Sequence, residues 1–150
     1  MEVDAGNTAW VMTATALVMF MTPGLALFYG GMVRSKNILG MLMQNFFALG
    51  IVSILWALIC YSLAFGGTNG LIGNFDFVGL KDTQVVDAGL PVLAFVAFQM
   101  TFAIITPALI TGAIADRMRF GAWVGFIVLW SVLVYAPVAH WVFDPAGWLF

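Results

Sequence analysis

The chain has 150 residues, of which 63% are hydrophobic and only 8% are charged, and its mean hydropathy is +1.06. A soluble domain of this length must cover its surface with polar side chains, so this composition excludes a water-soluble protein and indicates one that is solvated by lipid. The net charge of −2 gives no support to nucleic-acid binding, which requires clustered Lys and Arg.

Four long runs without a charged side chain follow one another, at 5–33, 37–75, 88–115 and 120–143. About 20 apolar residues cross the hydrocarbon core as a helix, so each run is long enough for one crossing. We predict helices at 8–32, 38–65, 90–115 and 121–141, and hence an all-α membrane protein with a single transmembrane domain over residues 1–150. The glycine-rich residues 66–70 end the second helix and open the longest loop, which runs to residue 89.

The basic residues are concentrated in two short loops. Arg34 and Lys36 lie between the first and second helices, Arg117 and Arg119 lie between the third and fourth, and only Lys81 lies elsewhere. Because Lys and Arg in short loops are retained on the cytoplasmic side, both loops are expected in the cytoplasm. The acidic N-terminus and the acidic 66–89 loop then face outward. The sequence therefore predicts a multi-pass protein of the cell membrane with its N-terminus outside, and no basic segment typical of a cleaved signal precedes the first helix.

Two of the predicted helices contain an internal proline, Pro23 in the first and Pro107 in the third. Each removes a backbone donor and is expected to kink its helix, and the hydroxyl of Thr22 or Thr106 is a ready compensating partner. A tolerated kink and a bend that shapes a pathway are both consistent with this pattern. Small residues also cluster, and close helix packing is sufficient to explain them; they are Gly30 with Gly31, Gly112 with Ala113, and the Gly121 to Gly125 spacing.

Catalytic chemistry is not expected within these residues. None of the predicted helices contains Asp, Glu, Lys or Arg, and no metalloprotease motif, phosphate-binding loop or nucleophilic triad can be assembled. The single cysteine, Cys60, has no partner for a disulfide or a cysteine-based metal site. His140 lies near the outer end of the fourth helix and is interpreted as a structural histidine of the interface rather than a general base. No enzyme activity and no cofactor are predicted.

Phe98 and Phe102 are four residues apart on the third helix and therefore share one face near its outer end. Such a pair is more often lipid-facing or part of the packing. If the face instead lines an outward-open vestibule, the ring faces attract a small cation, with roughly 0.5–2 kcal/mol per contact. Periodicity alone leaves both interpretations open.

Three blocks of the sequence resemble the ammonium transporter family, which also includes the methylammonium permeases and the Rhesus proteins. The stretch TPGLALFYGGMVRSKN at 22–37 looks like the end of that family's first helix. The stretch FQMTFAIITPALITGAIADRMRF at 98–120 is similar to its third helix and the following loop, and YAPVAHWVF at 135–143 resembles the end of its fourth helix. The resemblance covers essentially the whole chain, which corresponds to the N-terminal portion of the family.

Members of that family have about eleven helices in two inverted halves and assemble as homotrimers with one pore per subunit. The resemblance implies that ammonium is recruited at an outer aromatic site and passed as ammonia through a narrow apolar pore. By position in the motifs, Phe102 matches an outer gate phenylalanine, and Phe143 falls where the family usually has a tryptophan that recruits the cation. Phe98 is a further candidate for the same substrate-binding site. Phe143 keeps an aromatic ring but lacks the indole face that binds cations most strongly.

The resemblance also implies partners for the protein, and one alternative function stays open. The substrate is expected to be ammonium or methylammonium, and the helices are expected to contact membrane lipid. The intact protein is expected to be a homotrimer, with a nitrogen-regulatory protein of the PII class as a possible partner on its cytoplasmic face. The family's fifth helix and its pore histidines have no counterpart before Phe150, so the chain corresponds to four of the five helices in one half. The chain is therefore interpreted as part of an ammonium transporter, and the alternative is a truncated, non-conducting subunit or relic that only assembles with full-length transporters.

Overall fold

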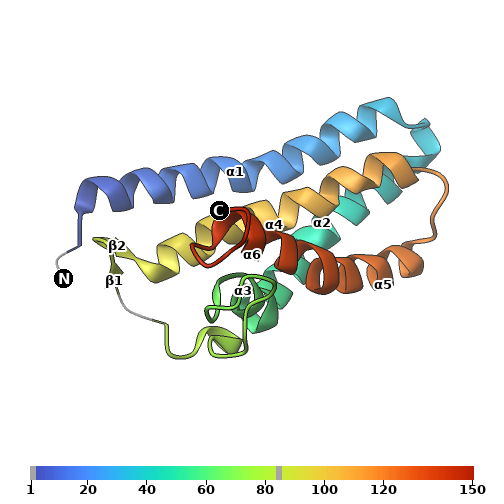
Figure 1. The fold of residues 1–150 in the computed structure, drawn as a ribbon. Helices are drawn as coiled ribbons and strands as arrows, with labels where there is room; N and C mark the ends of the chain where they lie inside the picture. Colours follow the sequence, from blue (N-terminus) through green and yellow to red (C-terminus); the bar gives the residue numbers. More distant parts are fainter. Residues whose placement is uncertain (1–2, 84–85) are drawn as a thin grey trace.

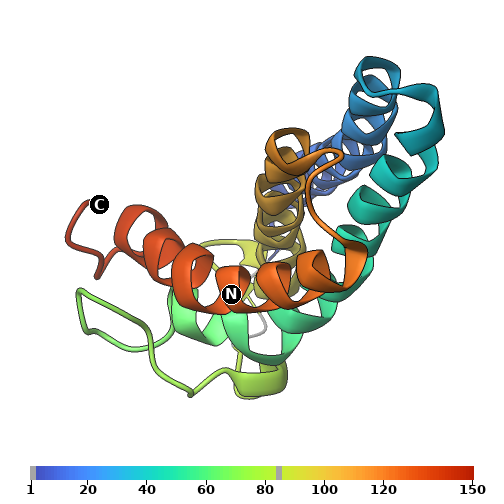
Figure 2. The ribbon, with the colours of Figure 1, turned by 90° about the vertical axis from the view of Figure 1, so that its right-hand side faces the viewer.

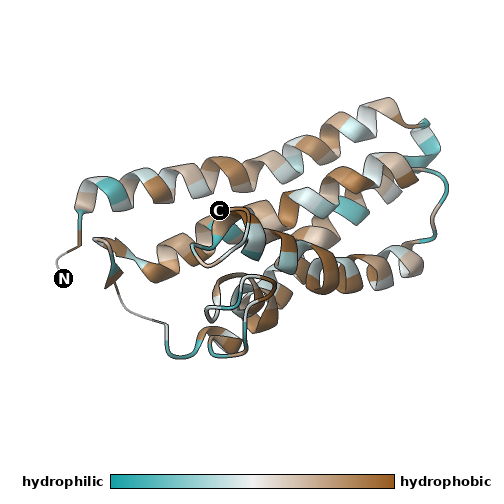
Figure 3. Cartoon of the chain, in the orientation of Figure 1, coloured by the Kyte–Doolittle hydropathy of each residue, from teal (hydrophilic) through white to brown (hydrophobic). Residues whose placement is uncertain are grey.

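The computed structural model describes residues 3–83 and 86–150 of the chain. Four helical segments in this part are long and apolar enough to cross a membrane: Ala5–Met32, Ser35–Phe65, Val92–Ile114 and Phe120–Phe143. The prediction of an all-α membrane protein with four transmembrane helices is confirmed, and each predicted helix end lies within three residues of the end in the structure. Figure 3 shows hydrophobic residues along the full length of these helices and hydrophilic residues mainly in the connections.

The first and third crossings are single helices, whereas the second and fourth are composite. Helix α1 (Ala5–Met32) begins where the Asp4 carboxylate accepts a hydrogen bond from the Asn7 N–H at 3.0 Å. The short helix η1 (Ser35–Asn37) leads into the second crossing, which consists of α2 (Ile38–Leu55), the π-helical turn η2 (Trp56–Cys60) and α3 (Tyr61–Phe65). The third crossing is α4 (Val92–Ile114), and the fourth consists of α5 (Phe120–Trp130), the π-helical turn η4 (Ser131–Tyr135) and α6 (Ala136–Phe143).

Helix α4 occupies the centre of the arrangement, where it packs against both α1 and α2 (Figure 1). Figure 2 shows the fourth crossing running obliquely to α1 and α4. The two π-helical turns face each other inside the protein, since the Cys60 thiol lies 3.8 Å from the Ser131 carbonyl oxygen. The Trp56 ring meets the Tyr135 ring edge-on across the same contact. The core therefore lies between the second, third and fourth crossings, and α1 remains largely exposed to the surroundings.

Both internal prolines lie within continuous helices, Pro23 in α1 and Pro107 in α4. The Thr106 hydroxyl donates to the Phe102 carbonyl oxygen at 2.7 Å, in the turn that precedes Pro107. Thr22 behaves differently from the prediction, because its hydroxyl is buried and has no hydrogen-bond partner among the described residues. The carbonyl that loses its donor to Pro107 is that of Ala103, four residues back, so the Thr106 hydrogen bond does not replace it. The predicted compensation by a neighbouring hydroxyl is therefore found at neither proline among the described residues.

Close helix packing explains only part of the predicted glycine positions. A Cβ atom added to Gly112 would lie 2.8 Å from the Tyr29 ring, so this glycine allows α1 and α4 to approach. A Cβ atom added to Gly121 or Gly125 would meet no heavy atom within 4 Å. The interpretation of the Gly121 to Gly125 spacing as a packing motif is therefore wrong within this chain, because these glycines lie on an open face of α5.

The loop after the second crossing is anchored to the helices at several points. The Ser62 hydroxyl donates to the Asn74 carbonyl oxygen at 2.8 Å and accepts from the Phe77 N–H at 3.0 Å. After a short 3-10 helix, η3 (Val78–Leu80), the loop ends in a hairpin of β1 (Val86–Asp87) and β2 (Leu90–Pro91). The strands are antiparallel, and the Asp4 N–H donates to the Gly89 carbonyl oxygen at 2.8 Å. The loop thus joins α3, α4 and the start of α1 at one end of the molecule (Figure 1).

Candidate functional site

The predicted pair on the third crossing does form, since the rings of Phe98 and Phe102 meet edge-on with centroids 5.1 Å apart. Both side chains are half-buried. The backbone beneath them is held by two hydroxyls, because Thr101 donates to the Phe98 carbonyl oxygen at 2.6 Å and Thr106 donates to that of Phe102. The rings therefore project from a stretch of α4 with additional hydrogen bonds, and part of their surface stays accessible.

Phe143 lies at the C-terminal end of α6 and is 47% exposed. It lines a cavity of about 600 Å³ at the end of the molecule that carries the hairpin. Neither Phe98 nor Phe102 is among the described residues that line this cavity. The structure thus brings two of the three predicted site residues together and places Phe143 beside a different set of rings, and a common cation site for all three stays a prediction.

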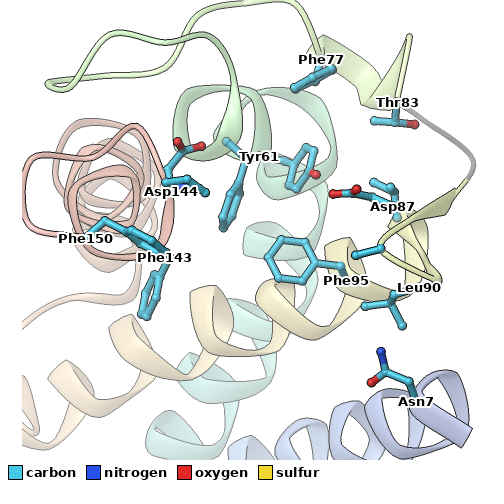
Figure 4. Close-up of a pocket in the computed structure, with 14 residues that line it drawn as sticks. Asn7, Tyr61, Phe77, Thr83, Asp87, Leu90, Phe95, Phe143, Asp144 and Phe150 are labelled. Carbon is cyan, nitrogen blue, oxygen red and sulfur yellow. The ribbon is translucent and has the colours of Figure 1, made fainter.

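Six of the fourteen described residues that line the cavity are aromatic, and they come from several elements (Figure 4). Tyr61 and Phe65 come from α3, Phe95 comes from the first turn of α4, and Phe77 comes from the loop between them. The rings support one another, because Phe65 meets Phe95 edge-on with centroids 5.2 Å apart and is packed against Tyr61 at 5.3 Å. Such a wall offers ring faces and edges to whatever occupies the cavity.

The charged groups that line the cavity are both carboxylates, those of Asp87 in β1 and Asp144 directly after α6. Both lie within electrostatic range of the Tyr61 hydroxyl. Asp144 is 6% exposed, and its Oδ1 accepts a hydrogen bond from the Ala146 N–H at 2.7 Å. Asp87 is exposed, and its carboxylate is turned toward the space in front of the Tyr61 ring (Figure 4). The cavity is thus aromatic and negatively charged.

His140 fixes the back of this region rather than facing the cavity. Its ring is completely buried, with Nδ1 2.9 Å from the Ala64 carbonyl oxygen and Nε2 2.5 Å from that of Asn69. The Asp144 carboxylate also lies near the ring, with Oδ2 3.9 Å from Nδ1. Neither nitrogen is free to act as a general base, in agreement with the predicted structural role.

Sequence reasoning missed Phe95, Tyr61 and Asp87 as residues of an outer cavity. Phe95 precedes Phe98 by three positions and shares the helical spacing that had singled out Phe98 and Phe102, so the signal for Phe95 was present. Tyr61 and Asp87 carried no such signal, because their approach depends on how the 66–89 loop folds back. Among residues 3–83 and 86–150, no group of three or more His, Cys, Asp or Glu side chains could hold a metal ion.

Comparison with known proteins gives a match to one family model over almost the entire chain. The model, described as the Ammonium Transporter Family, matches residues 9–150. The three sequence blocks on which the resemblance rested all lie within that range. The match therefore tests the resemblance over all four crossings.

Individual relatives agree with the family model. The chain is 51% identical over 148 residues to an ammonium transporter of Bacillus subtilis and 48% identical over 173 residues to one of Mycobacterium tuberculosis. These matches cover 96% and 97% of this chain and 36% of each relative. The crystal structure of Mep2 from Saccharomyces cerevisiae superposes with a TM-score of 0.89 at 34% identity, covering 99% of this chain and 34% of that one. The chain thus spans about a third of the length of the proteins that it matches.

Proposed function

Because this chain belongs to the ammonium transporter family, we propose that it forms part of a protein that carries ammonium across the membrane as ammonia. The observation that carries the proposal is the family match over residues 9–150, which includes all four crossings almost completely. The relatives that match the chain are named as transporters and not as enzymes. The proposal concerns the intact protein, because the chain spans only about a third of its relatives.

The physical reason for passing ammonia rather than ammonium is the cost of a charge in the membrane. A bare cation at bilayer depth is expensive, whereas a neutral molecule is not, so loss of a proton at the outer surface lowers the barrier. A site that first attracts the cation and then admits only the neutral molecule also rejects potassium, which has no proton to lose. The helices α1 to α6 contain no Asp, Glu, Lys or Arg, which agrees with an uncharged path.

We assign the recruitment of the cation to Phe98, Phe102 and Phe143. The paired, half-buried rings of Phe98 and Phe102 supply ring faces near the outer end of α4, and cation–π attraction is worth about 0.5–2 kcal/mol per contact. Phe143, the last residue of α6, lines a cavity together with residues of the hairpin and of the first turn of α4. Its partial exposure leaves its ring accessible to a cation that arrives from outside.

Uptake of radiolabelled methylammonium by cells that express the intact protein tests this assignment. Phe102→Ala is expected to lower uptake severalfold, because one ring of the pair is lost, while the amount of protein in the membrane stays the same. The matched control is Phe20→Ala in α1, whose ring is 76% exposed. This substitution removes an identical side chain from an exposed position outside the assigned site and is expected to leave uptake unchanged.

Two results would contradict the proposal at different levels. Unchanged uptake kinetics in a correctly inserted Phe102→Ala variant would remove Phe102 from the site. A wild-type protein that inserts and assembles but shows no uptake would favour the alternative of a non-conducting subunit.

Family membership also supports two proposals about partners. We propose that the intact protein is a homotrimer and that a nitrogen-regulatory protein of the PII class docks on its cytoplasmic face. The basic loops at 34–36 and 117–119 lie at the same end of the helices (Figure 1), where they are accessible to such a partner. Light scattering of the purified protein, alone and with an added PII protein, measures both associations.

A further inference from the structure

We propose that a groove at the cytoplasmic end of the helices binds the headgroup of a phospholipid of the phosphatidylethanolamine type, with Arg34 and Lys36 for its phosphate and Asp116 for its ammonium group. The proposal goes beyond transport and does not depend on it. The groove consists of two adjoining pockets of about 560 and 160 Å³. The residues that line both pockets are Val33, Met41, Ala115 and Asp116.

The groove lies where two of the crossings end. Its wider pocket is lined by Met32, the last residue of α1, and by Ala113 and Ala115 at the end of α4. These two helices run side by side to the end that carries the basic connections (Figure 1). The hydrocarbon core of a membrane ends where the apolar crossings end, so the groove lies at the depth of the lipid headgroups. Met32 is 70% exposed and extends the wall of the groove into an open apolar surface.

One part of the wall attracts a phosphate. Arg34 lines the wider pocket, Lys36 lines the narrower one, and both side chains are exposed. Gln44 also lines the narrower pocket but is only 8% exposed, and its side-chain amide has no hydrogen-bond partner among the described residues. A buried amide without a partner is costly, which favours a ligand that brings a hydrogen-bond acceptor. Phosphate oxygens accept from ammonium, guanidinium and amide N–H groups alike.

Another part of the wall attracts a cation. Asp116 lines both pockets and is exposed, and no ion pair joins it to Arg34 or Lys36 within the part of the chain that the structure describes. The last carbonyl oxygens of a helix lack intrahelical partners and give that end a partial negative charge. Both α1 and α4 end at the groove, and neither has a basic residue in its last turn to offset this charge.

A zwitterionic headgroup is the ligand that matches both parts. An anionic headgroup or free phosphate would leave Asp116 without a partner, and a simple cation would be repelled by Arg34 and Lys36. Phosphoethanolamine carries its phosphate and its ammonium group on one short link, and the ammonium group has three N–H donors. Phosphocholine has the same charges but no N–H donor, so it makes poorer contacts with a carboxylate and with carbonyl oxygens. Met32 and Val33 offer apolar contact to the adjoining glycerol and acyl chains.

Native mass spectrometry of the delipidated intact protein in detergent, titrated with one lipid at a time, tests the proposal. The wild type is expected to bind phosphatidylethanolamine at least about threefold more tightly than phosphatidylcholine or phosphatidylglycerol of the same acyl chains. Asp116→Asn is expected to weaken binding of phosphatidylethanolamine about threefold to tenfold, because one partly screened charge contact is lost. It should not weaken binding of phosphatidylglycerol. Asn tolerates the positive φ of 62° at this position, so the backbone is kept.

The phosphate contact has a matched pair of variants. Arg34→Gln is expected to weaken binding of phosphatidylethanolamine about threefold to tenfold. The control is Arg119→Gln, which makes the same change of charge in the other basic connection, at an exposed residue that lines neither pocket. The control is expected to change the affinity by less than about twofold.

Three results would overturn the inference. Equal affinity of the wild type for the three lipids would mean that the headgroup is not recognised. An equal loss in Arg34→Gln and Arg119→Gln would mean that lipid is attracted by the overall charge of this end and not by the groove. Unchanged binding of phosphatidylethanolamine to Asp116→Asn would remove the ammonium site. Transport is measured in none of these experiments, so a protein that binds the lipid as expected but takes up no methylammonium would contradict only the proposed function.

Discussion

The ring of His140 connects three parts of the chain that are far apart in sequence. It lies on α6, its two nitrogens face carbonyl oxygens at the end of α3 and in the following loop, and Asp144 lies one turn further along. The carbonyl oxygen of the buried Ala64 would lose this partner without the ring, and a buried polar group without a partner costs about 1–3 kcal/mol. This side chain therefore helps to hold the outer ends of the second and fourth crossings together.

Replacement of His140 tests this role. His140→Leu keeps a side chain of similar size but leaves the buried Ala64 carbonyl oxygen unpaired, and we expect it to destabilise the protein by about 1–3 kcal/mol. Thermal unfolding of the detergent-solubilised protein measures the loss. Trp141→Phe is the control, because the Trp141 indole donates to the Leu71 carbonyl oxygen from a more exposed position and should contribute less than about 1 kcal/mol. A variant His140→Leu as stable as Trp141→Phe would show that the ring only fills space.

The outer aromatic residues show what a single sequence can predict at this scale. Phe98 and Phe102 were found from their spacing, because two positions four apart on one helix are neighbours whatever the tertiary structure. The surroundings of Phe143 could not be found in this way, since its neighbours come from α3, α4 and a hairpin. The structural role of His140 was predicted, but its complete burial was not, because its partners are backbone carbonyl oxygens more than 70 positions away.

At the scale of the helices, the contact between α1 and α4 depends on the absence of a side chain at Gly112. The Tyr29 ring occupies the space above this glycine, and its hydroxyl donates to the Leu109 carbonyl oxygen at 3.2 Å. Any side chain at position 112 displaces the ring and breaks this hydrogen bond.

We expect Gly112→Val to lower stability by about 1–3 kcal/mol, because it overpacks a filled contact. The control is Gly31→Val. Gly31 lies on α1 two residues after Tyr29, and a Cβ atom added there meets no heavy atom within 4 Å. Both variants introduce the same residue into a helix, so the difference between their unfolding midpoints isolates the contact with Tyr29. Equal midpoints would mean that the ring moves aside without cost.

The lengths of the helices were predictable, and their internal irregularities were not. A charge-free run of sufficient length defines a crossing, because the bilayer sets the length that must be apolar. The π-helical turns at Trp56–Cys60 and Ser131–Tyr135 cannot be recognised from the hydropathy of the sequence. They arise where two crossings pack around Trp56 and Tyr135, and this contact is not encoded by either segment alone.

At the scale of the whole molecule, the charges are divided between the two ends of the helices. The connections that carry Arg34, Lys36, Arg117 and Arg119 lie together at one end, and the N-terminus and the hairpin lie at the other (Figure 1). Four crossings place both termini on the same side, and the N-terminal segment and the residues after α6 are both acidic. Since Lys and Arg in short loops are retained in the cytoplasm, this division determines which end faces outward.

Labelling of single cysteines by an impermeant maleimide in intact cells tests this orientation. Cys60 is only 1% exposed and is first replaced by Ala, so that each variant carries one reactive thiol. Lys81→Cys, at an exposed position of the outer loop, is expected to react in intact cells, whereas Arg34→Cys and Arg117→Cys should react only after the membrane is permeabilised. Reaction of Arg34→Cys or Arg117→Cys in intact cells would reverse the orientation. The outer cavity would then face the cytoplasm, and Phe143, which lines it, could not recruit cations from outside.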